Sequence, residues 1–249
     1  MKNISKKSAF TLAETLITLS IIGVVSAMTI PALVTKVRHK ILEHQFRDTY
    51  AIINQAWRLM KADSDYDDLF SVYTVHETGK GYYKSSELRT NFLNYLKRAY
   101  TLSDSKTPNY ATYADASKKY DGGSDYGLNV PNIVLQNGAM LKVGVSATGA
   151  EIYIYFVVDI NGLKGPNRAG HDMFLFLVNN SNDTIIGRKM TKLYTEEDIN
   201  KMTYMKEAAG FPCSVNSKQG ANGMGCADFA LRNKCPDNPA KTYWDCLPK

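Results

Sequence analysis

Residues 8–34 read SAFTLAETLITLSIIGVVSAMTIPALV, and Glu14 is the only charged residue among them. The 19 residues from Leu16 to Val34 would form a helix roughly 28 Å long. This length matches a hydrocarbon core of about 30 Å, so the stretch predicts a membrane-spanning helix. A carboxylate in a membrane helix costs about 2.5–3.5 kcal/mol, which indicates that Glu14 has a function or a partner.

Three interpretations of this segment compete. It could be a cleaved secretory signal with Val25-Ser26-Ala27 as the cleavage site, or a simple signal anchor. Neither gives Glu14 a role. The basic residues ahead of the span favour an N-terminus in the cytoplasm and a C-terminal part outside it. Three cations precede the span: Lys2, Lys6 and Lys7. Three more follow it and weaken the preference for this orientation: Lys36, Arg38 and Lys40.

The third interpretation rests on the motif Ser8-Ala9-Phe10-Thr11-Leu12-Ala13-Glu14. It resembles the class III leader junction of type IV prepilins and type II secretion pseudopilins. The resemblance implies that a prepilin peptidase cuts between Ala9 and Phe10 and methylates the new amine of Phe10. Glu14 then becomes the fifth mature residue and Pro31 the twenty-second, as in the family. The junction departs from the family at Ala9, which is usually Gly, and at Ala13, which is usually larger.

The resemblance also implies how the chain works. Glu14 of one subunit would pair with the amine of a neighbour, which fixes axial register because an unpaired buried carboxylate is costly. The implied partners are other pilin or pseudopilin subunits, the prepilin peptidase, the inner-membrane assembly platform and membrane lipid. The protein would sit in the inner membrane with its head outside the cytoplasm and then enter a periplasmic or surface filament. The sequence does not distinguish a pseudopilin from a pilin.

The domain boundaries follow from these features. We expect a leader over residues 1–9, a transmembrane and assembly helix over 10–34, an amphipathic continuation over 35–64 and a head over 65–249. Pro31 should kink or loosen the helix without ending it, because apolar residues recur at helical spacing beyond it. The helix should end near Ala62.

The sequence of the head predicts an α+β fold in which an antiparallel sheet packs on the long N-terminal helix. Residues 65–130 look irregular apart from a helix over 85–101, and residues 107–127 look like a surface loop rich in tyrosine. Its tyrosines either form an adhesive surface or pack back on the sheet. Strands are expected at 133–136, 139–143, 151–160, 173–178 and 184–188. Asn137-Gly138 suits a type I′ hairpin turn, and a helix is expected at 196–209.

All four cysteines lie in a tail that offers little core, and no CxxC pair exists, which argues against zinc. An even number of cysteines beyond a membrane segment predicts two disulfides. The four cysteines allow three different disulfide pairings, and the sequence does not choose among them. They are Cys213, Cys226, Cys235 and Cys246.

The loop after the third expected strand carries Asp159, Asn161 and Asp172, whose oxygens could bind calcium. Short Asx side chains also cap turns by accepting from local backbone, and we expect that role here. No catalytic motif is present, so the sequence predicts a non-enzymatic protein without a cofactor. The net charge of +6, half of it from leader lysines, does not indicate a nucleic-acid binder. The alternative function is a secreted or anchored binding domain with an ordinary signal peptide.

Overall fold

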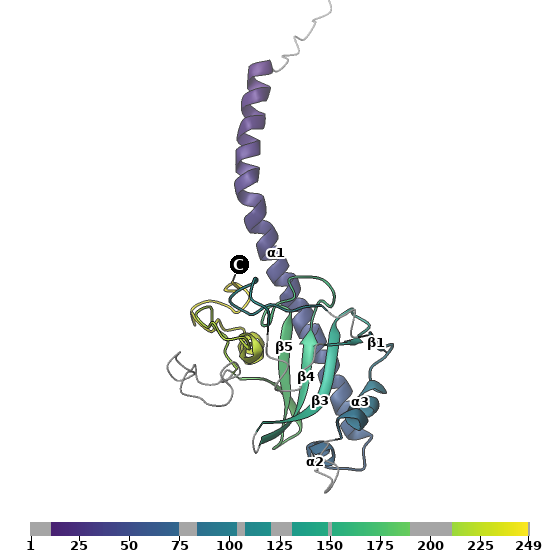
Figure 1. Cartoon of the computed structure of the whole chain (residues 1–249). Coiled ribbons are helices and arrows are strands. Elements are labelled where there is room, and N and C mark those ends of the chain that lie inside the picture. Colours follow the sequence, from purple (N-terminus) through teal and green to yellow (C-terminus); the bar gives the residue numbers. More distant parts are fainter. Residues whose placement is uncertain are drawn as a thin grey trace, which may run out of the picture. The chain divides into compact units, whose positions relative to one another are not determined.

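The computed structural model describes residues 11–74, 84–103, 108–120, 131–148, 151–189 and 211–248 (Figure 1). The chain divides into two units, residues 1–40 and residues 41–249, which are described separately. The described part of the first unit is the N-terminal part of one long helix, and the second unit is the α+β head. The predicted helix at 196–209 lies outside the described residues.

Helix α1 runs without interruption from Leu12 to Ala62, so it passes through Pro31 and ends at the predicted residue. Within the head, one stripe of this helix is buried, and its members recur every three, four or seven residues, as a helical face requires. They are Leu42, Phe46, Thr49, Ile53, Ala56, Trp57 and Met60. Within the head, α1 is therefore amphipathic.

The head contains one antiparallel sheet whose six strands follow one another in chain order. The strands are β1 (Tyr100–Thr101), β2 (Ile133–Val134), β3 (Met140–Thr148), β4 (Glu151–Asp159), β5 (Met173–Asn179) and β6 (Thr184–Gly187). All neighbouring strands are antiparallel because each connection returns the chain beside the strand it has just left. The predicted fold class is confirmed.

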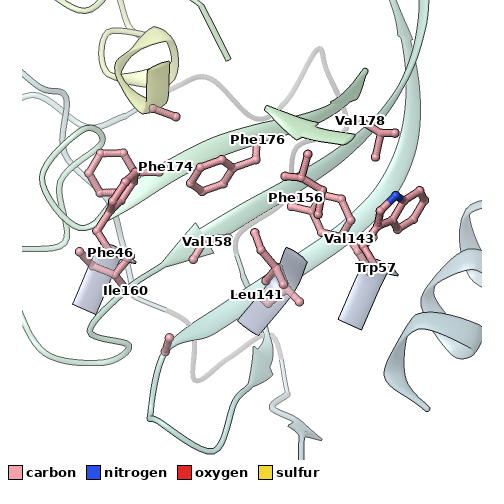
Figure 2. Close-up of a cluster of buried hydrophobic side chains, with 14 of the residues drawn as sticks. Phe46, Trp57, Leu141, Val143, Phe156, Val158, Ile160, Phe174, Phe176 and Val178 are labelled. Carbon is pink, nitrogen blue, oxygen red and sulfur yellow. The ribbon is translucent and has the colours of Figure 1, made fainter. Parts of the chain in front are cut away.

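Strand register places a continuous apolar row on the sheet face toward α1. Leu141 lies opposite Val158, which lies opposite Phe174 on the next strand. Side chains from these rows meet the buried stripe of α1 (Figure 2). The ring of Phe46 lies 4.7 Å from that of Phe174, and the ring of Trp57 lies 5.8 Å from that of Phe156. The main core is therefore the interface between α1 and the sheet.

The opposite sheet face is also buried, which the sequence did not predict. Tyr155, Val157 and Leu175 lie there under the segments 108–120 and 211–226. Tyr110 and Tyr113 belong to the first of these segments and are buried. Of the two interpretations of the loop tyrosines, Tyr110 and Tyr113 follow the second, because both pack back onto the head.

Two helical expectations need correction. The predicted helix at 85–101 is only α3, Ser85–Leu93. Beyond it the chain turns, with Arg98 at φ 56°, and enters strand β1, because the sheet edge offers Tyr100 a partner in Val134. The region predicted to be irregular contains a short helix, α2, Leu69–Thr74.

The hairpin between β2 and β3 is present, but its turn is not type I′. Such a turn needs positive φ at both central residues, and only Gly138 has one, at 84°. The amide of Gly138 donates to the Leu135 carbonyl, and the amide of Leu135 donates to the Ala139 carbonyl. This is a three-residue loop in which glycine takes the left-handed position. The Asn137 side chain instead accepts from the Ala139 amide.

Candidate functional site

The N-terminal part of α1 is apolar on all sides and exposed. The helix is long and apolar enough to cross a membrane by length and composition, and none of that stretch is buried among the described residues. Its large exposed side chains are Leu12, Leu16, Ile17, Leu19, Ile21, Ile22, Val24, Val25, Met28, Ile30, Leu33 and Val34. A helix that is apolar all round is buried by something outside itself, here lipid or other chains.

Hydroxyl groups inside this stretch are satisfied by the helix itself. Thr15 donates to the Leu12 carbonyl at 2.8 Å and Ser20 to the Leu16 carbonyl at 2.8 Å. Thr29 donates to the carbonyl of Val25 at 2.9 Å. Because each of these hydroxyls has an acceptor within one turn, none needs water, and the segment remains compatible with a hydrocarbon environment.

In the first turn of α1, Glu14 forms a capping box with Thr11 that the sequence analysis missed. Its Oε2 accepts from the Thr11 amide and from the Thr11 hydroxyl, each at 2.8 Å. The Glu14 amide in turn donates to Thr11 Oγ1 at 3.2 Å. The signal was available, since Thr followed by Glu three positions later is the capping-box spacing. Within a single chain, Thr11 therefore supplies two donors to this carboxylate.

Pro31 lies inside α1 and brings no amide to the ladder of hydrogen bonds. The Thr35 hydroxyl donates to the Pro31 carbonyl at 3.0 Å, so the turn after the proline has an additional bond. Pro31 does not end the helix, because α1 continues for 31 residues to Ala62. Ala9 and Phe10, the predicted cleavage residues, lie outside the described residues.

The tail contains two disulfides, Cys213–Cys226 and Cys235–Cys246, which settles the pairing left open by the sequence. The tail was expected to offer little core, and this expectation is wrong. Tyr243 and Trp244 are buried, and the Trp244 ring lies 5.5 Å from that of Phe46 on α1. The disulfides therefore hold core-forming residues in place and do not substitute for a core.

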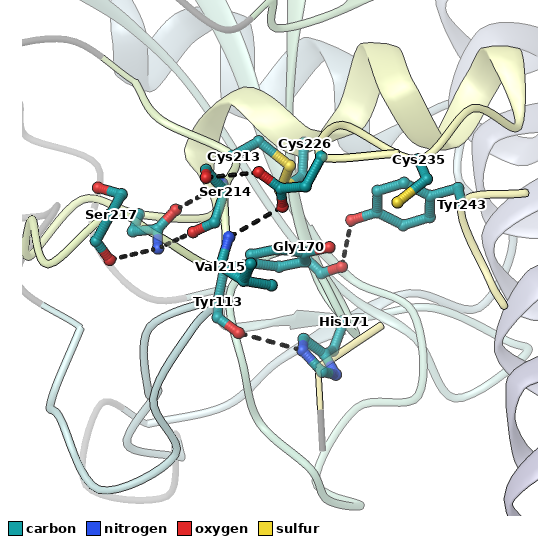
Figure 3. The surroundings of a disulfide bond; sticks show 12 residues. Tyr113, Gly170, His171, Cys213, Ser214, Val215, Ser217, Cys226, Cys235 and Tyr243 are labelled. Atoms are coloured by element: carbon teal, nitrogen blue, oxygen red, sulfur yellow. Dashed lines mark hydrogen bonds between the residues drawn. A yellow bond between two sulfur atoms is a disulfide. The ribbon is translucent and has the colours of Figure 1, made fainter. Parts of the chain in front are cut away.

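Gly170 lies at one of the places where the tail packs against the rest of the head (Figure 3). Its φ is 75°, and a Cβ there would lie 2.7 Å from both the Cys226 sulfur and the Tyr113 ring. Its carbonyl accepts from the Tyr243 hydroxyl. His171 beside it is buried, with Nε2 3.3 Å from the Tyr113 carbonyl. Only glycine fits this position, since both conformation and space exclude a side chain.

The calcium candidates lie at the ends of the connection between β4 and β5. Asp159 Oδ1 accepts from the amides of Asn161 (3.1 Å) and Gly162 (2.8 Å), and its Oδ2 accepts from the Tyr110 hydroxyl at 2.5 Å. Asp172 accepts from the amides of Asn167 and Arg168, both at 2.6 Å. Both carboxylates thus cap local backbone, as Asx side chains do in turns. Asn161 donates to the Gly165 carbonyl at 3.1 Å.

Burial raises the pKa of both carboxyls. For Asp159, burial is the largest cause, and repulsion from the charge of Asp172 raises the pKa further. For Asp172, burial is again the largest cause, and hydrogen bonds from backbone amides partly oppose the rise in pKa. Burial, followed by the charge of Asp159, also raises the pKa of Tyr110. In the described part of the chain, no group of three or more His, Cys, Asp or Glu residues is arranged to hold a metal ion.

A polar contact set at the end of α1 was also missed by the sequence analysis. Asp183, buried in the turn between β5 and β6, accepts from Lys61 Nζ at 2.9 Å and from the amides of Leu69 (3.0 Å) and Phe70 (3.1 Å). Its backbone carbonyl accepts from Trp57 Nε1 at 2.7 Å. Asp183 therefore joins α1, α2 and the sheet. Nothing local in the sequence marks it, because its partners lie 113 to 126 positions away.

Comparison with known proteins identifies the first part of the chain. Residues 4–30 match the prokaryotic N-terminal methylation motif. The resemblance of the leader junction is thereby confirmed, and the chain carries a class III leader of the prepilin and pseudopilin type. The motif implies processing by a prepilin peptidase and assembly with other pilins, and it supports membrane anchoring. Neither the search of curated proteins nor the search of solved structures found a match.

Proposed function

We propose that this protein is a non-enzymatic structural subunit, a pseudopilin or minor pilin, of a type II secretion pseudopilus or a type IV pilus. The observation that carries the proposal is the methylation motif at residues 4–30, which covers most of the apolar stretch of α1, and none of that stretch is buried. Such a helix needs a surrounding partner. Lipid supplies it before assembly, and the corresponding helices of neighbouring subunits supply it afterwards.

Glu14 connects the two states. In the single chain its carboxylate is held by Thr11, which provides hydrogen bonds but no positive charge. Cleavage between Ala9 and Phe10 would create an amine on Phe10. In the proposed filament, Glu14 of an incoming subunit pairs with the Phe10 amine of its neighbour. A compensated charge is tolerated in an apolar surrounding, so the pair selects one axial register.

The proposed location follows from the same helix. Residues 10–34 hold the chain in the inner membrane, with the head outside the cytoplasm, until the assembly platform extracts it into a filament. Two disulfides fit this placement, because they persist in oxidising compartments. We propose that the protein has no cofactor, because the calcium candidates Asp159 and Asp172 accept hydrogen bonds from protein donors.

The mature N-terminus tests the processing step. We would purify the protein from membranes of its native host and determine its first residue by mass spectrometry. N-methyl-Phe10 is the expected result. A start at Met28 would indicate an ordinary signal peptide cut after Ala27, and the binding-domain alternative would replace the filament proposal. An intact Met1 would indicate a plain membrane anchor.

Two substitutions of Glu14 separate its two contacts. Glu14→Gln keeps an acceptor oxygen for Thr11 but removes the charge, whereas Glu14→Ala removes both. We expect both variants to insert in the membrane and both to be impaired in entering filaments, because the proposed pair needs the charge. Co-assembly of Glu14→Gln at the wild-type level, measured by the fraction recovered in sheared filaments, would show that capping is its only role.

A further inference from the structure

A groove lies in the head between α1, the turn that follows α3 and the β2–β3 hairpin. Its volume is about 250 Å³. The lining is mainly apolar and includes Ile52, Ala56, Leu59, Leu96 and Leu135. Leu59 is 46% exposed although its side chain is large and apolar. Pockets for drug-sized ligands measure roughly 300–1,000 Å³, so this groove suits one large side chain.

The turn after α3 makes one side of this groove basic. Lys97 lines the groove, Arg98 follows it in the chain, and both are exposed. The Asp63 carboxylate lies against Tyr95, which also lines the groove. The two cations exceed this single acid. The groove therefore favours an apolar group that brings negative charge to the side of Lys97.

A segment with this complementary chemistry connects α1 to α2. It reads Asp65-Tyr66-Asp67, and all three residues are exposed. Tyr66 is 59% exposed, and tyrosine is enriched at interfaces because it combines an apolar ring with a polar tip. Tyr100 is 58% exposed, but its nearest charged neighbour in the chain is Arg98. Only the first of these two tyrosines carries the charge that the groove favours.

We propose that Tyr66 of one copy of this chain occupies the groove of a second copy. Its acidic neighbours, Asp65 and Asp67, then lie beside Lys97 of that copy. The tyrosine hydroxyl meets the amide of Gln55, which also lines the groove. Groove and tyrosine are different surfaces, so one contact leaves the groove of the first copy and the tyrosine of the second unused. The contact can therefore repeat along a row of copies.

This contact is too small to hold two copies together alone. A tyrosine side chain buries about 150–250 Å², whereas a stable interface buries roughly 1,200–2,000 Å² in total. The contact therefore acts between copies that α1 already holds in one membrane, where their effective concentration is high. The inference rests on the membrane anchoring of the proposed function and does not need the filament.

Photo-crosslinking of the full chain in membranes of its native host tests the contact. With p-benzoylphenylalanine in place of Tyr66, light should join the probe to groove residues of a second copy. The product has twice the mass of one chain, and peptide mapping by mass spectrometry locates the joined residue. The matched control carries the probe at Leu163, which is also 59% exposed, and should give no adduct in the groove.

Charge reversal tests the pairing between two copies that carry different tags. Lys97→Glu in the copy without the probe should lower the crosslink yield about twofold to fivefold, as exposed ion pairs do. Lys164→Glu reverses another exposed cation of the head and should leave the yield unchanged. A probe copy with D65K/D67K should lose yield against a wild-type copy and regain it against the Lys97→Glu copy.

No crosslinked pair, a crosslink outside the groove, or a crosslink to a different protein would overturn the proposal. Equal yields with Lys97→Glu and Lys164→Glu would also overturn it. The mature N-terminus of the same sample separates this failure from that of the proposed function. N-methyl-Phe10 without the crosslink refutes the contact alone. An intact Met1 with the crosslink refutes the filament and leaves the contact standing.

Discussion

The two parts of α1 bury their apolar residues in opposite ways. In residues 12–40, large apolar side chains point in every direction and are 44–78% exposed. In residues 41–62, a single stripe is buried against the sheet, and Phe46 is only 1% exposed. A striped helix finds its partner within its own chain, whereas a helix that is apolar all round finds it outside. One continuous helix thus combines a stretch that packs in the head with a stretch that is apolar on all sides.

The largest expected difference between the two parts is in head stability. Phe46→Ala removes a ring that contacts Phe174, Phe176 and Trp244, and we expect a loss of about 3–5 kcal/mol in the free energy of unfolding. Ile17→Ala should leave it unchanged, because Ile17 belongs to the first unit and its side chain is 60% exposed. Denaturation of the full chain in detergent, followed by tryptophan fluorescence, measures both. Equal effects would break the comparison.

The disulfides should have the next largest effect. Replacing Cys213 and Cys226 by Ala should cost about 2–4 kcal/mol of head stability, because the bond closes a loop of the tail that contributes to the core. Thiol titration of the unfolded wild type without reductant should find no free cysteine. Reactive thiols in the unfolded chain, or an unaltered denaturation midpoint in the double variant, would contradict this assignment.

The polar contacts at the end of α1 should contribute less. Asp183→Asn keeps acceptor oxygen but loses the charge that holds Lys61, and it cannot serve both helix amides equally well. We expect a loss of about 1–3 kcal/mol in the same denaturation measurement. Asp67→Asn is the control, because Asp67 is exposed. Equal losses in both variants would assign the effect to net charge.

The smallest expected effect is local to the beginning of α1. Thr11→Ala removes the hydroxyl of the capping box, which should cost about 1 kcal/mol in the first helical turn. Amide hydrogen exchange should become faster from Leu12 to Leu16 and unchanged in the head. Thr11→Ser keeps the hydroxyl and should exchange like wild type. Faster exchange in the head would mean that the two parts of the helix are coupled in stability.

Sequence periodicity and turn residues correctly predicted the helices and strands whose limits depend on neighbouring residues. The helix end at Ala62 and the strands from 139 to 188 follow from periodicity and turn residues. Periodicity failed where a distant partner decides the outcome. Tyr100 continues a helical pattern but pairs with Val134 on β2, and Asn137-Gly138 adopts a different turn because the loop includes a third residue.

The sequence by itself determined the leader motif, the membrane-length helix with Glu14 and Pro31, the amphipathic stripe and the class of the head. These are properties of spacing and composition, and they act over a few turns. Only the tertiary structure decided the cysteine pairing, the burial of Tyr110 and Tyr113, the contacts of Asp183, and the contact of Asp159 with Tyr110. Those features join residues far apart in the chain, and no local pattern specifies which distant groups close packing brings together.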